Sequence, residues 1–187
     1  YFDKTNDNKH YTELFSLSSL VNNFLVTEFS MNWDSMKNSV FVTKNIDELA
    51  ELGPVWDYDW AFGNKNMYSI DTYFPESWHT TNDYFTNEYY YQSVQWNRYL
   101  IKDPYFLLQV YNKYKEIRPT IIEEMLKDGA KIDTYEKLYK EAGLANDKLW
   151  SYSYKSYDGS LFSKAYVELN DFIDTRTSWL DTQFSSF

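Results

Sequence analysis

The sequence of 187 residues contains no cysteine. Disulfide bonds, thiol catalysis and thiolate metal sites are therefore excluded, because each of them needs a cysteine sulfur. The two histidines, His10 and His79, lie far apart and lack the spacing of paired ligands, so we do not expect a zinc site. Serine is abundant, but no pair of glycines flanks a serine as in a nucleophile elbow, and a serine triad is not indicated.

Positive charge and long apolar runs are also scarce. Lys and Arg number 18 against 28 Asp and Glu, which gives a formal net charge of −10. A nucleic-acid partner is not expected, because binding to a phosphate backbone requires a basic surface. A membrane partner is not expected either, since anionic lipids would repel this charge and no apolar run approaches the roughly 20 residues of a membrane span.

Glycine and proline are few, whereas aromatic residues are abundant. Only 5 Gly and 4 Pro occur, while Phe, Trp and Tyr make up 21% of the chain. Because large rings bury much apolar surface, this composition indicates a packed domain rather than a disordered segment. The length fits one domain or a large lobe, and Tyr1 in place of Met leads us to expect that something is missing upstream.

Apolar residues recur at helical spacing in most of the chain. Residues 17–29 are expected to form an amphipathic helix capped by Ser16 or Ser18. Residues 64–98 keep no period and are expected to form a long loop that could include one short helix. Further helices are expected from Asp103-Pro104, from Pro119 to near Gly129, from Asp133 to Gly143, and along the apolar stripe from Phe162 to Leu180.

Two short extended segments interrupt the helical pattern. Val40–Thr43 is rich in β-branched residues, and residues 55–60 follow Gly53-Pro54. With residues 44–52 as the connection, these segments are expected to pair as a hairpin. The predicted fold is therefore mostly α with a small β-hairpin (α+β), built as a single unit over residues 1–187.

The second extended segment carries a pair of carboxylates. If residues 55–60 are extended, side-chain alternation places Asp57 and Asp59 on one face and three aromatic rings on the other. Two such carboxylates repel each other unless a cation lies between them, and Mg²⁺ takes oxygen ligands from carboxylates, waters and substrate phosphates. The alternative is that Asp57 or Asp59 caps the strand end and faces water, as many exposed aspartates do.

A second polar segment lies upstream of the predicted hairpin. Protein kinases use an Asp that orients the acceptor hydroxyl, then an Asn that helps to hold a metal ion, then a hairpin and a metal-binding Asp. Asp34, Asn38 and Asp57 occur in this order. The spacing from Asp34 to Asn38 is one residue shorter than in the usual kinase motif, so the match is one of role and order.

These segments together resemble the CotH kinase family. The resemblance rests on the segment GPVWDYDWAFGN at residues 53–64, on Asn32-Trp33-Asp34 with Asn38, and on Arg176 followed by Trp179-Leu180-Asp181. The helices with Trp96, Leu100, Asp103-Pro104 and Phe106 are also similar, so the resemblance spans most of the chain. It implies the carboxyl-terminal lobe of an atypical protein-kinase-like fold that transfers phosphate from ATP to a Ser or Thr of a spore-coat or extracellular protein.

The resemblance also implies roles for individual residues. By position, Asp34 would be the catalytic acid and Asp57 the metal-holding residue, with Asn38 and Asp59 as further ligands of Mg²⁺. The alternative function is a non-catalytic structural or binding module, such as a spore-coat or cell-surface scaffold for a protein or polysaccharide partner. The presence of Asp34, Asp57 and Asp59 together favours the enzyme.

Two other features have more than one interpretation. Arg176 lies on the apolar stripe of the last predicted helix and is expected to support the core. It would do so either in a buried ion pair or with its stem on apolar surface and its head in water. The rings at residues 84–85 and 89–91 are expected to pack beneath the long loop, with a stacking platform for sugars or peptides as the alternative.

We predict that this chain alone binds Mg·ATP weakly or not at all. The family's amino-terminal lobe, which covers the phosphates and supplies a lysine, is expected to precede Tyr1, and none of the five glycines belongs to a glycine-rich phosphate loop. Isothermal titration calorimetry of the chain with Mg·ATP measures this affinity, and micromolar binding would refute the prediction.

Overall fold

The computed structural model describes residues 10–32, 34–35, 38–64, 75–81, 96–150 and 161–185. Within these ranges the chain is mostly helical with one two-stranded antiparallel sheet, which confirms the predicted combination of helices and a small hairpin. In chain order the elements are η1 (Tyr11–Glu13), α1 (Leu17–Ser30), β1 (Val42–Thr43), β2 (Glu51–Leu52), η2 (His79–Thr81), α2 (Asn97–Leu100), α3 (Pro104–Ile121), the π-helical turn η5 (Ile122–Leu126), α4 (Lys131–Leu149) and α5 (Leu161–Phe184).

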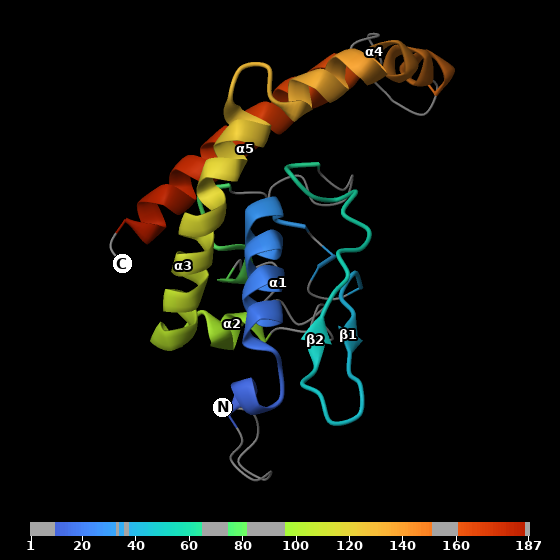
Figure 1. Ribbon diagram of the computed structural model, residues 1–187. Coiled ribbons are helices and arrows are strands. Elements are labelled where there is room, and N and C mark those ends of the chain that lie inside the picture. Colours follow the sequence, from blue (N-terminus) through green and yellow to red (C-terminus); the bar gives the residue numbers. More distant parts are fainter. Residues whose placement is uncertain are drawn as a thin grey trace.

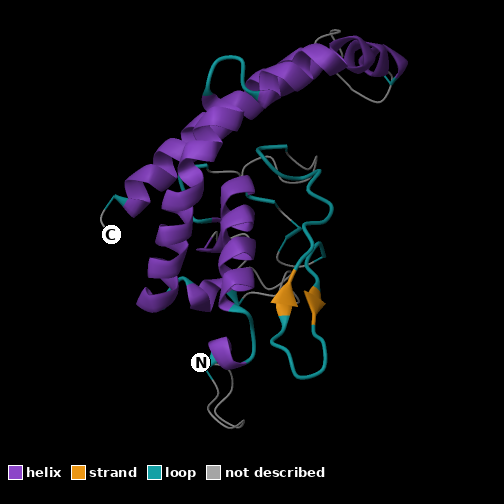
Figure 2. Ribbon diagram, viewed as in Figure 1, coloured by secondary structure: helices purple, strands orange, loops and turns teal. Residues whose placement is uncertain are grey.

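Helix α1 lies between α3 on one side and the hairpin on the other (Figure 1). Helix α5 passes the carboxyl-terminal end of α1, and it extends with α4 away from this body (Figure 2). None of the helices in the described part of the chain combines the length and apolar character that crossing a bilayer requires.

The ends and the buried face of α1 follow from its sequence. Ser16 accepts a hydrogen bond from the amide of Ser19 at 3.4 Å, as one of the two predicted caps. Met31 ends the helix in the left-handed conformation, with a φ of 49°. Phe24 is completely buried against Phe106 of α3, and their rings meet edge to face with centroids 5.4 Å apart.

Helix α3 begins where the sequence predicts but does not restart at Pro119. Asp103 caps it by accepting a hydrogen bond from the amide of Tyr105 at 2.9 Å. The prediction of a new helix at Pro119 is wrong, because α3 continues through this proline into η5. Ile117 and Ile121, on either side of Pro119, pack against the core, and this packing keeps the helix continuous at the cost of one hydrogen bond.

The predicted hairpin is present, but its second strand lies elsewhere. Val42 of β1 pairs with Leu52 of β2 in an antiparallel register. Strand β2 therefore lies inside the predicted connection 44–52, and residues 55–60 do not form a strand. The hairpin is confirmed, while the placement of its second strand is wrong.

The backbone around Pro54 explains this difference. The amide of Gly53 still donates to the carbonyl of Phe41 at 3.1 Å, but Pro54 has no N–H with which to continue the ladder. Asp57 then has a φ of 58°, which is incompatible with an extended strand. The predicted alternation of Asp57 and Asp59 along a strand is therefore also wrong.

Helix α4 runs through Gly143 instead of ending there. The helix begins at Lys131 rather than at Asp133, which lies in its first turn and accepts a hydrogen bond from the amide of Gly129 at 2.7 Å. The glycine at 143 is needed for packing, since a Cβ there would lie 2.2 Å from Cδ2 of Phe162 in α5. Gly143 therefore allows a ring to approach the backbone of α4.

Helix α5 is the longest described helix, with 24 residues, as its apolar stripe predicts. Asp181 joins it to α3, because Arg118 donates to this carboxylate from Nε at 2.8 Å and from Nη2 at 2.6 Å. The hydroxyl of Tyr114 donates to the same carboxylate at 2.8 Å. These contacts fix the end of α5 against the body of the molecule.

Substitution of Gly143 by alanine is expected to destabilise the protein, although alanine is the better helix former by about 1 kcal/mol. The added methyl group meets the ring of Phe162, and overpacking of this kind costs about 1–3 kcal/mol. Urea denaturation followed by circular dichroism measures the effect. The double variant Gly143→Ala with Phe162→Leu should recover stability relative to Gly143→Ala alone, and a Gly143→Ala variant as stable as the wild type would contradict the assigned packing.

Candidate functional site

The turn after α1 and the irregular segment after the hairpin lie side by side. The amide of Phe62 donates to the carbonyl of Ser30 at 2.7 Å, and Nδ2 of Asn32 donates to the carbonyl of Asp57 at 3.3 Å. Ser30 and Asn32 are both fully buried. The structure therefore brings the two acidic segments of the sequence together, and these segments form the candidate site.

Asp34 and Asn38 lie in one tight turn of the first segment. The carbonyl of Asp34 accepts hydrogen bonds from the amides of Asn38 at 3.0 Å and of Ser39 at 2.9 Å. Its own amide donates to Oδ1 of Asn32 at 3.3 Å. The exposed Asn38 directs Nδ2 toward Oδ1 of Asp34 at 3.5 Å, so the two predicted site residues of this segment face each other.

Asp57 and Asp59 are both exposed, and their side chains lie close enough to interact electrostatically. The left-handed backbone at Asp57, rather than strand alternation, accompanies this approach. The charge of Asp59 raises the pKa of Asp57 from its ordinary value, and desolvation, the hydrogen bond to Asp59 and the charge of Asp34 act in the same direction. The carboxylates of both segments thus repel one another across the site.

The oxygen-rich chemistry of this site fits Mg²⁺. Within the described ranges, no three His, Cys, Asp or Glu side chains lie close enough together to hold a metal ion by themselves. Mg²⁺ does not require such a cage, because it keeps several waters and commonly takes one or two carboxylates together with substrate phosphates. A cation near Asp57 and Asp59 would also relieve their repulsion. The side chains present therefore suit a magnesium ion shared with a phosphate ligand.

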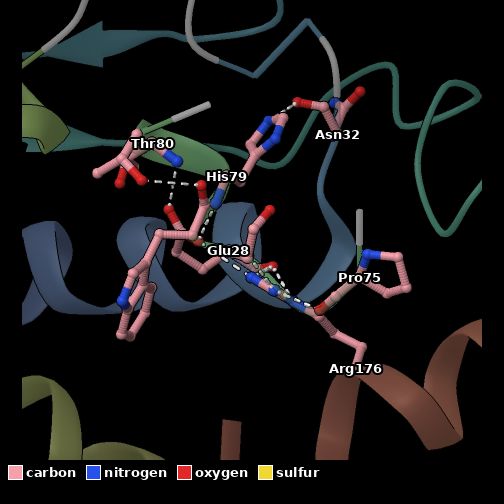
Figure 3. Close-up of polar contacts among 9 residues, drawn as sticks. Glu28, Asn32, Pro75, His79, Thr80 and Arg176 are labelled. Carbon is pink, nitrogen blue, oxygen red and sulfur yellow. Dashed lines mark hydrogen bonds and ion pairs between the residues drawn. The ribbon is translucent and has the colours of Figure 1, made fainter. Parts of the chain in front are cut away.

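A buried ion pair joins α1 to α5 (Figure 3). Nη2 of Arg176 lies 3.0 Å from Oε2 of Glu28, and these side chains are 0% and 1% exposed. Arg176 also donates to the carbonyls of Glu28 at 2.7 Å and of Pro75 at 2.8 Å. Of the two predicted roles for Arg176, the structure shows the buried ion pair.

Glu28 also binds the segment that carries His79. It accepts hydrogen bonds from the amides of His79 at 2.8 Å and Thr80 at 2.9 Å. Burial raises the pKa of Glu28, while the charge of Arg176 and these amides oppose the rise. Burial lowers the pKa of His79 to about 3, so its ring is neutral at pH 7, and Nε2 donates to the carbonyl of Asn32 at 2.9 Å.

Sequence reasoning found Arg176 but missed its partner Glu28 and the structural role of His79. A signal for Glu28 was available, because this residue follows Phe24 by four positions on the apolar stripe of α1. Carboxylate and guanidinium groups on two apolar stripes indicate a buried pair. His79 had no comparable signal, since its surroundings keep no period. The rings at 84–85 and 89–91 lie outside the described residues.

Comparison with known proteins assigns the chain to a family. A family model described as CotH kinase protein matches residues 2–180. The chain belongs to the CotH kinase family. No match was found among curated proteins or among solved structures. Membership of the CotH family implies a phosphotransferase that in general uses ATP and a divalent metal ion, and the family is associated with the spore coat.

Acidification is expected to destabilise the protein through His79. The pKa of this ring is about 3 in the folded chain and about 6.5 in an unfolded one, so the unfolded chain binds more protons between these values. The stability that the neutral ring contributes is complete above about pH 6.5 and is lost toward pH 3, by up to about 1.4 kcal/mol per pH unit.

Urea denaturation at pH 7, 6 and 5 measures this dependence. His79→Gln should lose stability less steeply on acidification than the wild type, whereas the variant His10→Gln, at an exposed histidine, should follow the wild type. Equal slopes for His79→Gln and the wild type would show that His79 is not buried in its neutral form.

Proposed function

We propose that this chain carries the catalytic and metal-binding part of a Mg²⁺-dependent protein Ser/Thr kinase, which acts on a spore-coat or extracellular protein. The observation that supports the proposal is the approach of Asp34 and Asp57 from two segments that Asn32 joins by hydrogen bonds. This arrangement has the order of roles found in protein kinases. Membership of the CotH family supports the reaction class.

The proposed reaction assigns one task to each acidic segment. Asp34 orients the hydroxyl of the acceptor Ser or Thr and accepts its proton while the hydroxyl oxygen attacks the γ-phosphorus of ATP. The bond from this phosphorus to the bridging oxygen breaks, and ADP leaves. Asp57, with Asp59 and Asn38, would hold Mg²⁺, which neutralises charge on the phosphates. Most of the rate then comes from positioning and electrostatic stabilisation, since phosphoryl transfer needs little covalent help.

In this proposal the remaining parts of the nucleotide site come from outside residues 1–187. None of the five glycines belongs to a phosphate-covering loop. We place that loop and the lysine that contacts the phosphates in an amino-terminal lobe, which makes this chain the carboxyl-terminal lobe. The chain alone is then inactive.

A non-catalytic binding module is the second candidate function, and the surface of the hairpin favours it. Phe41 and Trp56 form an edge-to-face pair with centroids 6.0 Å apart, although 43% and 59% of their surfaces are exposed. Ile46 at the hairpin turn is 90% exposed. Exposed apolar patches are typical of surfaces that bind another protein, and the Phe41–Trp56 pair is such a patch.

Phosphate incorporation by the full-length protein tests the kinase function. With Mg·ATP and a protein acceptor, Asp34→Asn and Asp57→Ala should each lower the rate at least about a hundredfold, because each removes a group that acts in the transition state. Asp174→Ala, at an exposed position on α5, is the matched control and should retain the wild-type rate. A full-length protein that incorporates no phosphate, or an Asp57→Ala variant as active as the wild type, would favour the binding module.

A further inference from the structure

One buried side chain contacts both acidic segments of the candidate site. Asn32 is 0% exposed. Its Nδ2 donates to the carbonyl of Asp57, and its Oδ1 accepts from the amide of Asp34, each at 3.3 Å. A single planar amide therefore binds the backbone of the proposed proton acceptor and of the proposed metal ligand.

The backbone of Asn32 is held from the core. Its carbonyl accepts hydrogen bonds from Oγ of Ser35 at 2.7 Å and from Nε2 of His79 at 2.9 Å. The amide of His79 donates to Glu28, which is paired with Arg176 (Figure 3). Asn32 is thus connected to a buried network on one side and to two partly or fully exposed acidic residues on the other.

Asp57 depends on such a contact for its orientation. Its side chain is exposed, so core packing does not hold it, and its φ of 58° is unfavourable for a residue with a Cβ. The hydrogen bond from Nδ2 of Asn32 to the carbonyl of Asp57 restrains the backbone in this left-handed conformation. The side-chain amide of Asn32 also restrains Asp34, by accepting a hydrogen bond from its backbone N–H. Movement of one acidic segment is therefore transmitted to the other.

We propose that Asn32 is a positioning residue that sets the separation of Asp34 and Asp57, an inference that rests on the proposed kinase function. The role requires one donor and one acceptor on a short rigid side chain. Leucine has similar size without either group, and alanine lacks both size and polar atoms. Asn32 itself touches neither the phosphates nor the acceptor in this role.

The test compares Asn32 with Asn97, which is also buried, at 2% exposure. Asn97 is the first residue of α2, and α2 lies near the amino-terminal end of α1, away from the acidic segments that follow its other end (Figure 1). Asn32→Ala and Asn97→Ala therefore remove the same amide from two buried positions, of which only the first contacts the site. Asn32→Leu is the second variant, because it keeps the volume of the side chain.

Three measurements on the full-length protein separate positioning from support of the core. Mn²⁺ alone is the metal probe, and its free concentration is followed by electron paramagnetic resonance. Hydrogen exchange of the Asp34 amide is measured without metal, and kcat and KM for Mg·ATP are measured with a protein acceptor.

Asn32→Ala and Asn32→Leu should weaken Mn²⁺ binding about tenfold, speed exchange of the Asp34 amide by a similar factor and lower kcat. Asn97→Ala should leave all three within about twofold of the wild type.

Asp57→Ala distinguishes failure of this inference from failure of the proposed function. If Asp57→Ala abolishes Mn²⁺ binding and phosphate incorporation while folded Asn32 variants change neither, the positioning role is overturned and the kinase function stands. If Asp57→Ala also changes neither, the kinase function fails and the inference fails with it. Loss of folding in both Asn32 variants, with Asn97→Ala folded, would assign Asn32 to the core and overturn the proposal.

Discussion

The ion pair between Glu28 and Arg176 is the interaction on which the rest of the structure depends. It joins α1 to α5, and both side chains are almost completely shielded from water. Burial of two charges costs several kcal/mol per ion, so such a pair persists only when further hydrogen bonds satisfy its atoms. Glu28 obtains them from the amides of His79 and Thr80, and Arg176 from backbone carbonyls. The pair therefore holds residues 75–80, including the start of η2, as well as joining two long helices.

This buried network provides the fixed orientation that the exposed carboxylates of the site cannot obtain from packing. Carboxylates that bind a metal ion and phosphates must remain open to solvent, and apolar packing cannot hold them in place. Preorganised orientation is nevertheless the main source of rate in phosphoryl transfer. The connection from Arg176 through Glu28 and His79 to Asn32 resolves this conflict, because hydrogen bonds extend from the buried core to the backbone of Asp34 and Asp57. The backbone of Asp34 and Asp57 is thus held in place by hydrogen bonds to its main-chain atoms, although the side chains are partly or fully exposed.

The sequence predicts the start of a helix well where the start depends only on neighbouring residues. Ser16 and Asp103 cap their helices as expected, since a cap depends on neighbouring residues only. Pro119 and Gly143 carry the local signals of helix boundaries but lie inside helices, because distant packing overrides their local preference. The second strand was misplaced because hairpin register depends on the partner strand and on where Pro54 ends the ladder.

The order of Asp34, Asn38 and Asp57 along the chain predicts the candidate site better than the expected strand geometry does. The predicted strand alternation of Asp57 and Asp59 is wrong, because Asp57 adopts a left-handed backbone conformation. That residue combines two locally unfavourable features, a positive φ and a neighbouring like charge. Proteins tolerate such conflicts mainly at functional sites, where other contacts maintain them. Because Asn32 contacts the backbone of both acidic segments, the strain and the repulsion occur together at an exposed place that the buried network holds.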